Sequence, residues 1–187
     1  MIGVNMSNIE AAGNYPRPKA GGYVIKITSV ANNKQKERLD IEFDFAEGEL
    51  EDYYKDMQDR FKFWGGKFSK SYKANALPFF RGFIETVNGC NSVDGLIIND
   101  FEDVDETKLV GLRVGMVVGE KEYIGNDGKK KVRLDTYNAK FVPVDDIRSC
   151  NYTVPEFIPL EDVPNESAEV VDMTGDFGPI TNDECPF

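Results

Sequence analysis

The chain has 187 residues, 33 of them acidic and 22 basic, which gives a formal net charge of −11. This length suffices for one domain with a proper core and a tail. The sequence contains no histidine, the commonest general base and transition-metal ligand, so hydrolase chemistry is disfavoured and no catalytic residue, metal or cofactor is assigned.

The first part of the chain predicts a flexible arm followed by two strands. Residues 1–20 contain several glycine and proline residues and are expected to form a loose N-terminal arm. Residues 23–30 alternate between apolar and polar side chains, which predicts a half-buried strand. Residues 38–45 alternate more cleanly, so Leu39, Ile41, Phe43 and Phe45 are expected to face the core, and Asp40, Glu42 and Asp44 to face outward.

Residues 60–73 combine basic and aromatic side chains and contain no acid. Proteins hold single-stranded nucleic acid with such mixtures, because cations neutralise phosphates and aromatic faces stack on bases. We interpret this stretch as a loop, and its phenylalanines Phe61, Phe63 and Phe68 as core residues rather than contacts. The expected DNA-binding residues here are Arg60, Lys62, Trp64, Lys67, Lys70, Tyr72 and Lys73.

The next segment predicts a short helix over residues 77–87. Pro78 suits its first turn, where a missing N–H costs little, and Gly89 suits its C-terminal cap. The expected buried face consists of Phe79, Phe80, Phe83, Ile84 and Val87.

Residues 113–124 and 129–142 predict a long β-hairpin around the turn formed by residues 125–128. The inward set of the second strand changes phase between Leu134 and Tyr137, which suggests a bulge. The hairpin is a second candidate DNA contact, unless its lysines only form a solvated edge that prevents aggregation. Its expected contacts are Lys121, Tyr123, Lys129, Lys130, Lys131 and Arg133, and Lys26 is assigned to the same surface.

Short antiparallel strands with one helix between strand groups are typical of a small Greek-key barrel of the OB type. The predicted fold is therefore mainly β with one short helix, an OB-like barrel over residues 21–150 and a disordered acidic tail over residues 151–187. A different small α+β sandwich would give a similar pattern.

The tail contains nine acidic residues and no basic one between Asn151 and Phe187, so it is expected to stay solvated. It ends in Asp183, Glu184, Cys185, Pro186 and Phe187. This end resembles the C-terminal tip of bacterial single-stranded DNA-binding proteins, which runs acid-acid-acid-aliphatic-Pro-Phe. Here Asn182 occupies the first acidic position and Cys185 the aliphatic one. The resemblance implies a partner-binding tip, whereas an ordinary acidic tail would only keep the protein soluble.

The body resembles small replication and recombination proteins of phages and mobile elements of Gram-positive bacteria. The residues that carry this resemblance run from Leu112 to Gly115, then through Glu122-Tyr123 and residues 126–129 to Asp146-Ile147-Arg148. The resemblance implies an OB-like fold that binds single-stranded DNA.

The expected function is therefore non-specific coating of single-stranded DNA during replication or recombination, with partners recruited through the tip. Those partners would be a recombinase, helicase, primase or polymerase, and the sequence leaves a homo-oligomer open. The main alternative is an acidic interaction or inhibitor protein that imitates DNA and does not itself bind it, and a nuclease is the third. Three widely spaced cysteines and no segment of membrane-spanning length favour a bacterial host cytoplasm.

Overall fold

The computed structural model describes residues 16–160. In chain order its elements are β1 (Gly21–Asn33), β2 (Arg38–Phe45), α1 (Tyr53–Phe61), β3 (Lys67–Ser71), α2 (Leu77–Asn91), β4 (Ile97–Ile98), η1 (Asn99–Phe101), β5 (Asp103–Val104), η2 (Glu106–Leu109), β6 (Arg113–Val118), β7 (Glu120–Ile124), β8 (Lys130–Leu134), η3 (Thr136–Asn138), β9 (Lys140–Val142) and α3 (Val144–Arg148).

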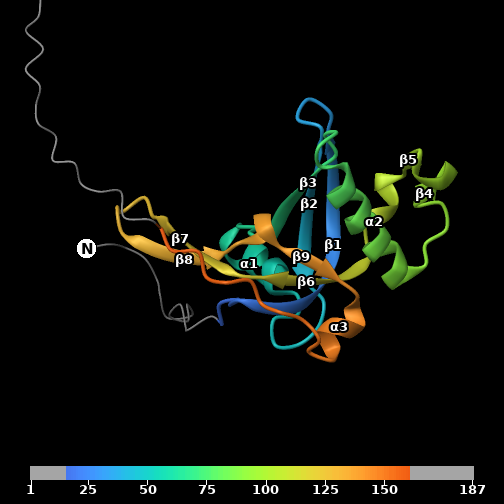
Figure 1. The fold of residues 1–187 in the computed structure, drawn as a ribbon. Coiled ribbons are helices and arrows are strands. Elements are labelled where there is room, and N and C mark those ends of the chain that lie inside the picture. The colour runs from blue at the N-terminus through green and yellow to red at the C-terminus, as the bar shows by residue number, and fades with distance from the viewer. Residues whose placement is uncertain (1–15, 161–187) are drawn as a thin grey trace, which may run out of the picture.

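Five antiparallel strands form one curled sheet, a half-barrel, in the order β3-β2-β1-β6-β9 (Figure 1). The β7–β8 hairpin projects from one side of this half-barrel, and the short β4 and β5 strands lie on the opposite side (Figure 1). The prediction of a mainly β fold is confirmed. Residues 16–160 contain three α-helices rather than the one expected.

The alternation of β2 places its apolar side chains in the core as predicted. Leu39, Ile41, Phe43 and Phe45 are all buried. Asp44 was expected to face outward, and this expectation is wrong: the side chain is 4% exposed. Its carboxylate accepts hydrogen bonds from the backbone N–H groups of Tyr54 and Lys55, each at 2.9 Å.

These bonds explain why α1 forms directly after the acidic loop of residues 46–52. The first N–H groups of a helix have no partner within the helix, and Asp44 supplies acceptors for two of them from a neighbouring strand. Burial raises the pKa of Asp44, and the backbone N–H bonds partly offset this rise. The capping carboxylate belongs to Asp44, outside the helix, so no local sequence pattern predicts α1.

The stretch of residues 60–73 is not a continuous loop. It contains the end of α1, a short connection and the strand β3. The connection passes so close to the core that a Cβ at Gly66 would lie 2.1 Å from the carbonyl oxygen of Phe43. Gly66 is therefore required for β3 to pair with β2 at this point.

The helix α2 confirms the predicted segment and extends it to Asn91. Phe83, Ile84 and Val87 are buried as expected, but Phe79 is 77% exposed, so its assignment to the buried face is wrong. Its C-terminal cap is Ser92, in the left-handed region with φ of 52°, rather than Gly89.

The predicted hairpin forms, with an interruption at the predicted position. β7 pairs with β8, and β6 pairs with β9 in continuation of the same hairpin. The residues between β8 and β9 form η3, a helical turn, where the phase change suggested a bulge. The two halves of the hairpin can therefore serve different purposes, with β6–β9 in the sheet and β7–β8 projecting from it.

Phenylalanines from both edge strands meet across the opening of the half-barrel. The ring of Phe68 on β3 lies 4.9 Å from that of Phe141 on β9, and Phe83 of α2 packs 4.9 Å from Phe141. Side-chain packing thus closes the barrel where the two edge strands share no ladder of hydrogen bonds.

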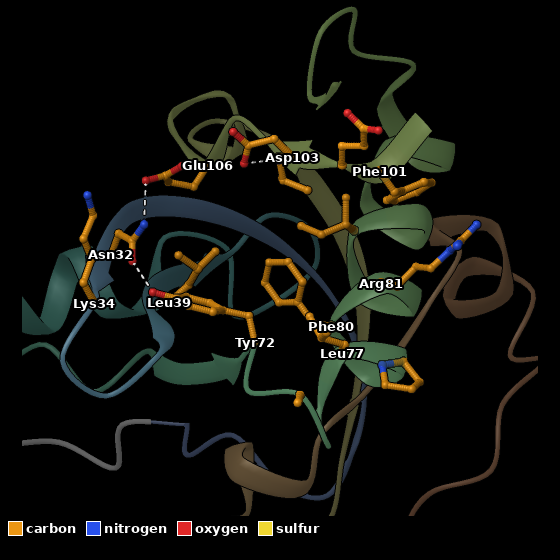
Figure 2. Close-up of a pocket in the computed structure, with 15 residues that line it drawn as sticks. Asn32, Lys34, Leu39, Tyr72, Leu77, Phe80, Arg81, Phe101, Asp103 and Glu106 are labelled. Atoms are coloured by element: carbon orange, nitrogen blue, oxygen red, sulfur yellow. Dashed lines mark hydrogen bonds between the residues drawn. The ribbon is translucent and has the colours of Figure 1, made fainter. Parts of the chain in front are cut away.

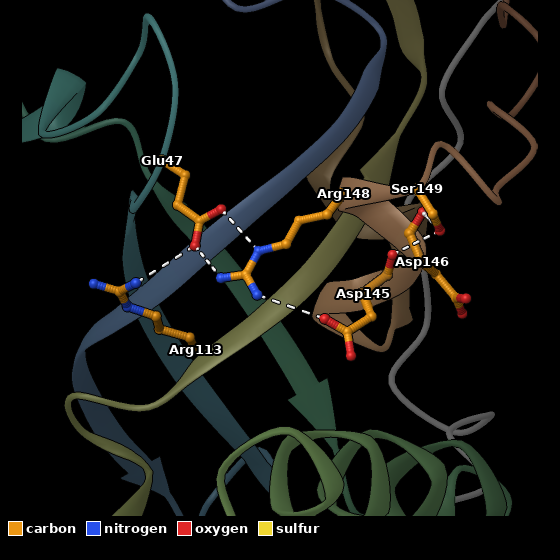
Figure 3. A network of polar contacts seen from close by, with 6 residues as sticks. All are labelled: Glu47, Arg113, Asp145, Asp146, Arg148 and Ser149. Carbon is orange, nitrogen blue, oxygen red and sulfur yellow. Dashed lines mark hydrogen bonds and ion pairs between the residues drawn. The ribbon is translucent and has the colours of Figure 1, made fainter.

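The helix α3 is tied to the body by a network of charged groups (Figure 3). Arg148 binds Glu47 through two nitrogen atoms, at 2.6 and 3.2 Å, and Arg113 lies 3.5 Å from the same carboxylate. The hydrogen bonds from Arg148 lower the pKa of Glu47. The network fixes the direction in which the chain leaves the sheet.

Residues 151–160 were assigned to the tail but pack against the body. Ile158 forms a parallel bridge with Lys121 of β7, so the packed part of the chain continues to Leu160. The rest of the predicted tail, the partner-binding tip (residues 183–187) and most of the N-terminal arm lie outside the described residues. Among residues 16–160 no helix combines the length and apolarity needed to cross a bilayer.

Candidate nucleic-acid interface

A groove of about 600 Å³ lies between the β7–β8 hairpin, η3, α1 and the connection before β3. We call it the hairpin groove. It brings together four of the predicted site residues, which are Lys67, Lys121, Tyr123 and Arg133. It also contains Arg17, Tyr53, Phe63 and Tyr137, which were not among the predicted contacts.

Two aromatic rings of the hairpin groove are largely exposed to solvent. Phe63 is 57% exposed and Tyr137 is 77% exposed. The interpretation of Phe63 as a core residue is wrong, as it is for Phe61, whereas Phe68 is buried as expected. Exposed rings beside cations are the feature that single-strand binding proteins use to stack bases.

The turn η3 presents Tyr137 from a fixed base. The hydroxyl of Thr136 donates a 2.9 Å hydrogen bond to the carbonyl oxygen of Lys67, which ties η3 to β3. The backbone N–H of Asp135 donates to the carbonyl oxygen of Gly119. The ring of Tyr137 therefore projects from a turn held on two sides, which limits the entropy that ordering it on a ligand would cost.

The carboxylate of Asp135 organises the base of the hairpin. It is 3% exposed and accepts hydrogen bonds from the Nζ of Lys121, at 2.6 Å, and from the side-chain amide of Asn138. Burial alone would raise the pKa of Asp135, but the hydrogen bonds from Lys121 and Asn138, together with the charge of Lys121, outweigh burial and lower it. Lys121 is therefore a structural cation, and most of its charge is compensated within the protein.

The cations of the hairpin groove differ in how much charge they can offer a ligand. Lys67 is paired with Glu42 at 2.9 Å. Arg133 packs its guanidinium over the ring of Tyr123, 5.0 Å from the centroid, and no carboxylate of residues 16–160 forms an ion pair with it. Arg17 lines the same groove, near Tyr53. Arg133 and Arg17 are therefore the groove cations best able to neutralise phosphate.

Two predicted contacts share a different depression. Trp64 is half-buried, and its indole N–H donates a 3.1 Å hydrogen bond to the carbonyl oxygen of Gly66. Lys26 lines the same depression, together with Asp44 and Arg113. This depression does not include the exposed rings of the hairpin groove, so Trp64 is placed beside the groove rather than in it.

Lys70 and Tyr72 lie in two other regions, the opening of the half-barrel and a pocket beside α2. The Nζ of Lys70 lies 4.3 Å from the centroid of the Phe141 ring in the opening of the half-barrel. Burial lowers the pKa of Lys70 to about 8. Tyr72 donates a hydrogen bond to Asn32 and lines a separate pocket beside α2. Neither side chain faces the hairpin groove.

The remaining predicted contacts lie at exposed positions and are not part of the groove lining. Arg60 is in the last turn of α1 and Lys62 caps that helix, while Lys73 follows β3. At the hairpin tip, Lys131 is paired with Asp127 at 3.1 Å and Lys130 lies 4.0 Å from Glu122. Lys129 is exposed in the turn itself.

The sequence contained a signal for only one of the two exposed rings. Tyr137 falls where the strand pattern breaks, and an aromatic residue at such a break is free of the alternation that would bury it. Phe63 alternates with Phe61 and resembles an inward strand residue, so no local pattern separates it from the core.

No group of three or more cysteine and acidic side chains among residues 16–160 is arranged to hold a metal ion. Comparison with models of protein families finds no match for this chain. A comparison with curated proteins finds no match either.

Proposed function

We propose that this protein binds single-stranded DNA without sequence preference, through the hairpin groove, and coats exposed strands during replication or recombination. The observation that carries the proposal is the pair of exposed rings, Phe63 and Tyr137, set among the cations Arg17, Lys67 and Arg133. No enzymatic activity is part of the proposal.

The two kinds of side chain would contribute different parts of the binding energy. A base stacked on an aromatic ring is worth about 1–3 kcal/mol and requires an unpaired base, so stacking gives preference for single strands. Phosphate neutralisation by arginine and lysine releases counterions and makes the affinity depend on salt. Neither contribution reads the base sequence, which fits a coating protein.

The groove continues onto the outer face of β2 and β3. A second depression there shares Lys67, Thr136 and Tyr137 with it. Unpaired acids on β2 would repel phosphate, but both acids that line this depression have internal partners. Asp40 pairs with Arg38 at 2.8 Å and Glu42 with Lys67 at 2.9 Å. A bound strand could therefore run from the hairpin across β2 and β3.

The connectivity supports an OB-like barrel. Three strands precede α2 and two follow it in the five-stranded sheet, which is the order expected for that fold. OB-type barrels bind oligonucleotides on the face of strands 2 and 3 and with the loops after strands 1 and 4. The corresponding features here are β2 and β3, the β1–β2 turn and the β7–β8 hairpin.

The acidic tip, residues 183–187, is proposed to recruit a recombinase, helicase, primase or polymerase to the coated strand. Support comes from the sequence of the tip and from the path of the chain before it. Ile158 exchanges backbone hydrogen bonds with Glu120 and Glu122 of β7, at 3.0 and 2.9 Å, which holds this end of the described chain beside the hairpin. A partner held there would be close to the DNA in the bacterial host cytoplasm.

The net charge of −11 favours a second candidate, an acidic interaction protein that imitates DNA. Fluorescence anisotropy of labelled oligo-dT and of a matched duplex, at two salt concentrations, distinguishes the two. Coating predicts binding of oligo-dT that weakens with salt and little binding of duplex. No binding of either probe at low salt would contradict the proposal and favour the imitation of DNA.

A further inference from the structure

A second pocket, of about 830 Å³, lies between the end of β1, the start of α2 and the β4–β5 region (Figure 2). We call it the helix pocket. It shares no lining residue with the hairpin groove. Its volume is within the range of sites that bury most of a small ligand or a few side chains. The helix pocket is therefore separate from the proposed DNA-binding site.

The interior of the helix pocket is apolar and aromatic. Leu39 and Ile84 form a fully buried floor. The rings of Tyr72 and Phe80 meet edge to face at 6.0 Å and form one wall. Leu77, at the mouth, is 49% exposed. A large apolar side chain that entered would therefore be covered on several sides and would bury this exposed surface.

Acidic groups dominate the rim. The acidic residues are Glu102, Asp103 and Glu106, and the basic residues are Lys34 and Arg81. Arg81 is already engaged, because its Nε lies 2.8 Å from Glu85 and its guanidinium covers the Phe101 ring at 4.4 Å. With Arg81 engaged, the three carboxylates outnumber the remaining cation, Lys34, so the charge left for a ligand is negative.

One of these acids is held in place by the wall of the pocket. Tyr72 donates its hydroxyl to Asn32 at 2.8 Å, and the amide of Asn32 donates to Glu106 at 2.9 Å (Figure 2). This chain of bonds links an aromatic wall to a rim carboxylate in a defined geometry. A ligand that packs against Tyr72 would place its positive charge near the carboxylate of Glu106, which is already held in position. Binding would therefore cost less side-chain entropy.

We propose that the helix pocket docks a segment of a partner protein that carries a large apolar or aromatic side chain flanked by arginine or lysine. The acidic rim excludes two other occupants. Phosphate groups of nucleic acid would face three carboxylates, as would Asp183 and Glu184 beside Phe187 in the tip of this chain.

An NMR titration of the full chain, labelled with ¹⁵N, tests the proposal with three peptides. One has a single phenylalanine between two arginine pairs, the second replaces arginine by glutamate, and the third has the tip sequence of residues 181–187. The basic peptide should shift the backbone resonances of Tyr72, Phe80 and Phe101, and the other two should not. Shifts caused equally by an acidic peptide, or located outside the helix pocket, would overturn the proposal.

Two variants test the rim and the mouth separately. The double change Asp103→Asn and Glu106→Gln should weaken the binding of the basic peptide about tenfold. Leu77→Ser should also weaken it, and its partly exposed position keeps the fold intact. The matched control is Glu49→Gln with Glu51→Gln, which removes two exposed charges elsewhere. Equal losses in the rim variant and the control would reduce the effect to net charge and overturn the proposal.

Discussion

The Nζ of Lys121 lies 2.6 Å from the Oδ1 of Asp135, and this ion pair joins β7 to the residue directly after β8, at the base of the projecting hairpin. The carboxylate is buried and the ammonium largely so, with 25% of the lysine side chain exposed. The same carboxylate holds Asn138, and so the turn that presents Tyr137. The position of the hairpin groove therefore depends on the contacts of Asp135 with Lys121 and Asn138.

Asp135→Asn should lower the free energy of unfolding by about 3 kcal/mol, because it leaves the ammonium of Lys121 partly buried without its anion. Urea denaturation measures this change. The control is Asp145→Asn, whose side chain is 93% exposed, and it should change stability by less than about 0.5 kcal/mol. Equal stability of the two variants would show that the pair does not anchor the hairpin.

The same pair makes stability depend on acid. The pKa of Asp135 is lowered on folding, so its contribution is complete above the unfolded value of about 3.9. It is lost as the pH falls through the lower, folded pKa. Unfolding free energies measured between pH 6 and pH 2 should therefore fall less in Asp135→Asn than in the unaltered protein. Parallel curves would contradict the lowered pKa.

The buried ammonium group of Lys70 should destabilise the folded protein at neutral pH. Its folded pKa of about 8 lies below the unfolded value of about 10.4, so the unfolded state binds more protons between these limits and stability rises with pH there. Lys70→Met should stabilise the protein by about 2 kcal/mol at pH 7, and by less at pH 10. Lys73→Met, at an exposed position, is the control. A loss of stability in Lys70→Met at pH 7 would contradict this account.

Glu47→Gln should lower the free energy of unfolding by about 1 kcal/mol, since it weakens the pairs with Arg148 and Arg113, both partly exposed. Thermal unfolding at neutral pH measures the effect. Glu49→Gln in the same loop, which is exposed, should leave the midpoint unchanged. A midpoint of Glu47→Gln equal to that of the control would show that the network adds nothing to stability.

Arg133→Gln should reduce the salt dependence of oligo-dT binding, because one fewer phosphate would be neutralised. The slope of log K against log salt should become shallower by about 0.7. Lys108→Gln is the control, since Lys108 lies in η2 and donates to the carbonyl oxygen of Asp94, away from the hairpin. An unchanged slope in Arg133→Gln would place the phosphates elsewhere.

The sequence alone predicted the buried face of an element wherever the spacing of its apolar residues determined that face. The alternation of β2 predicted its buried face, and the apolar face of α2 was largely correct. Asp44 broke the alternation because its carboxylate caps α1, ten residues further along the chain. Periodicity describes residues that are close along the chain. It therefore cannot predict a contact between a strand and a helix that forms further along the chain.

The candidate site was predictable only in part. The basic and aromatic composition identified Lys67 and Arg133, which do line the groove. The same composition grouped Lys70 and Tyr72 with them, because residues near in sequence were assumed to share a surface. In β3 and its flanks the side chains instead alternate between the groove, the core and the helix pocket. Tyr137 joins the groove only through the tertiary contact of Thr136 with β3.

The central claim is that exposed rings of the hairpin groove stack on unpaired bases, and a comparison of Tyr137→Ala with Phe79→Ala tests it most directly. Both side chains are 77% exposed, so neither change should alter the fold, but only Tyr137 lies in the groove. The measurement is the affinity for labelled oligo-dT by fluorescence anisotropy. We predict that Tyr137→Ala weakens binding about tenfold and that Phe79→Ala leaves it unchanged. Unchanged affinity in Tyr137→Ala, or an equal loss in both variants, would contradict the account.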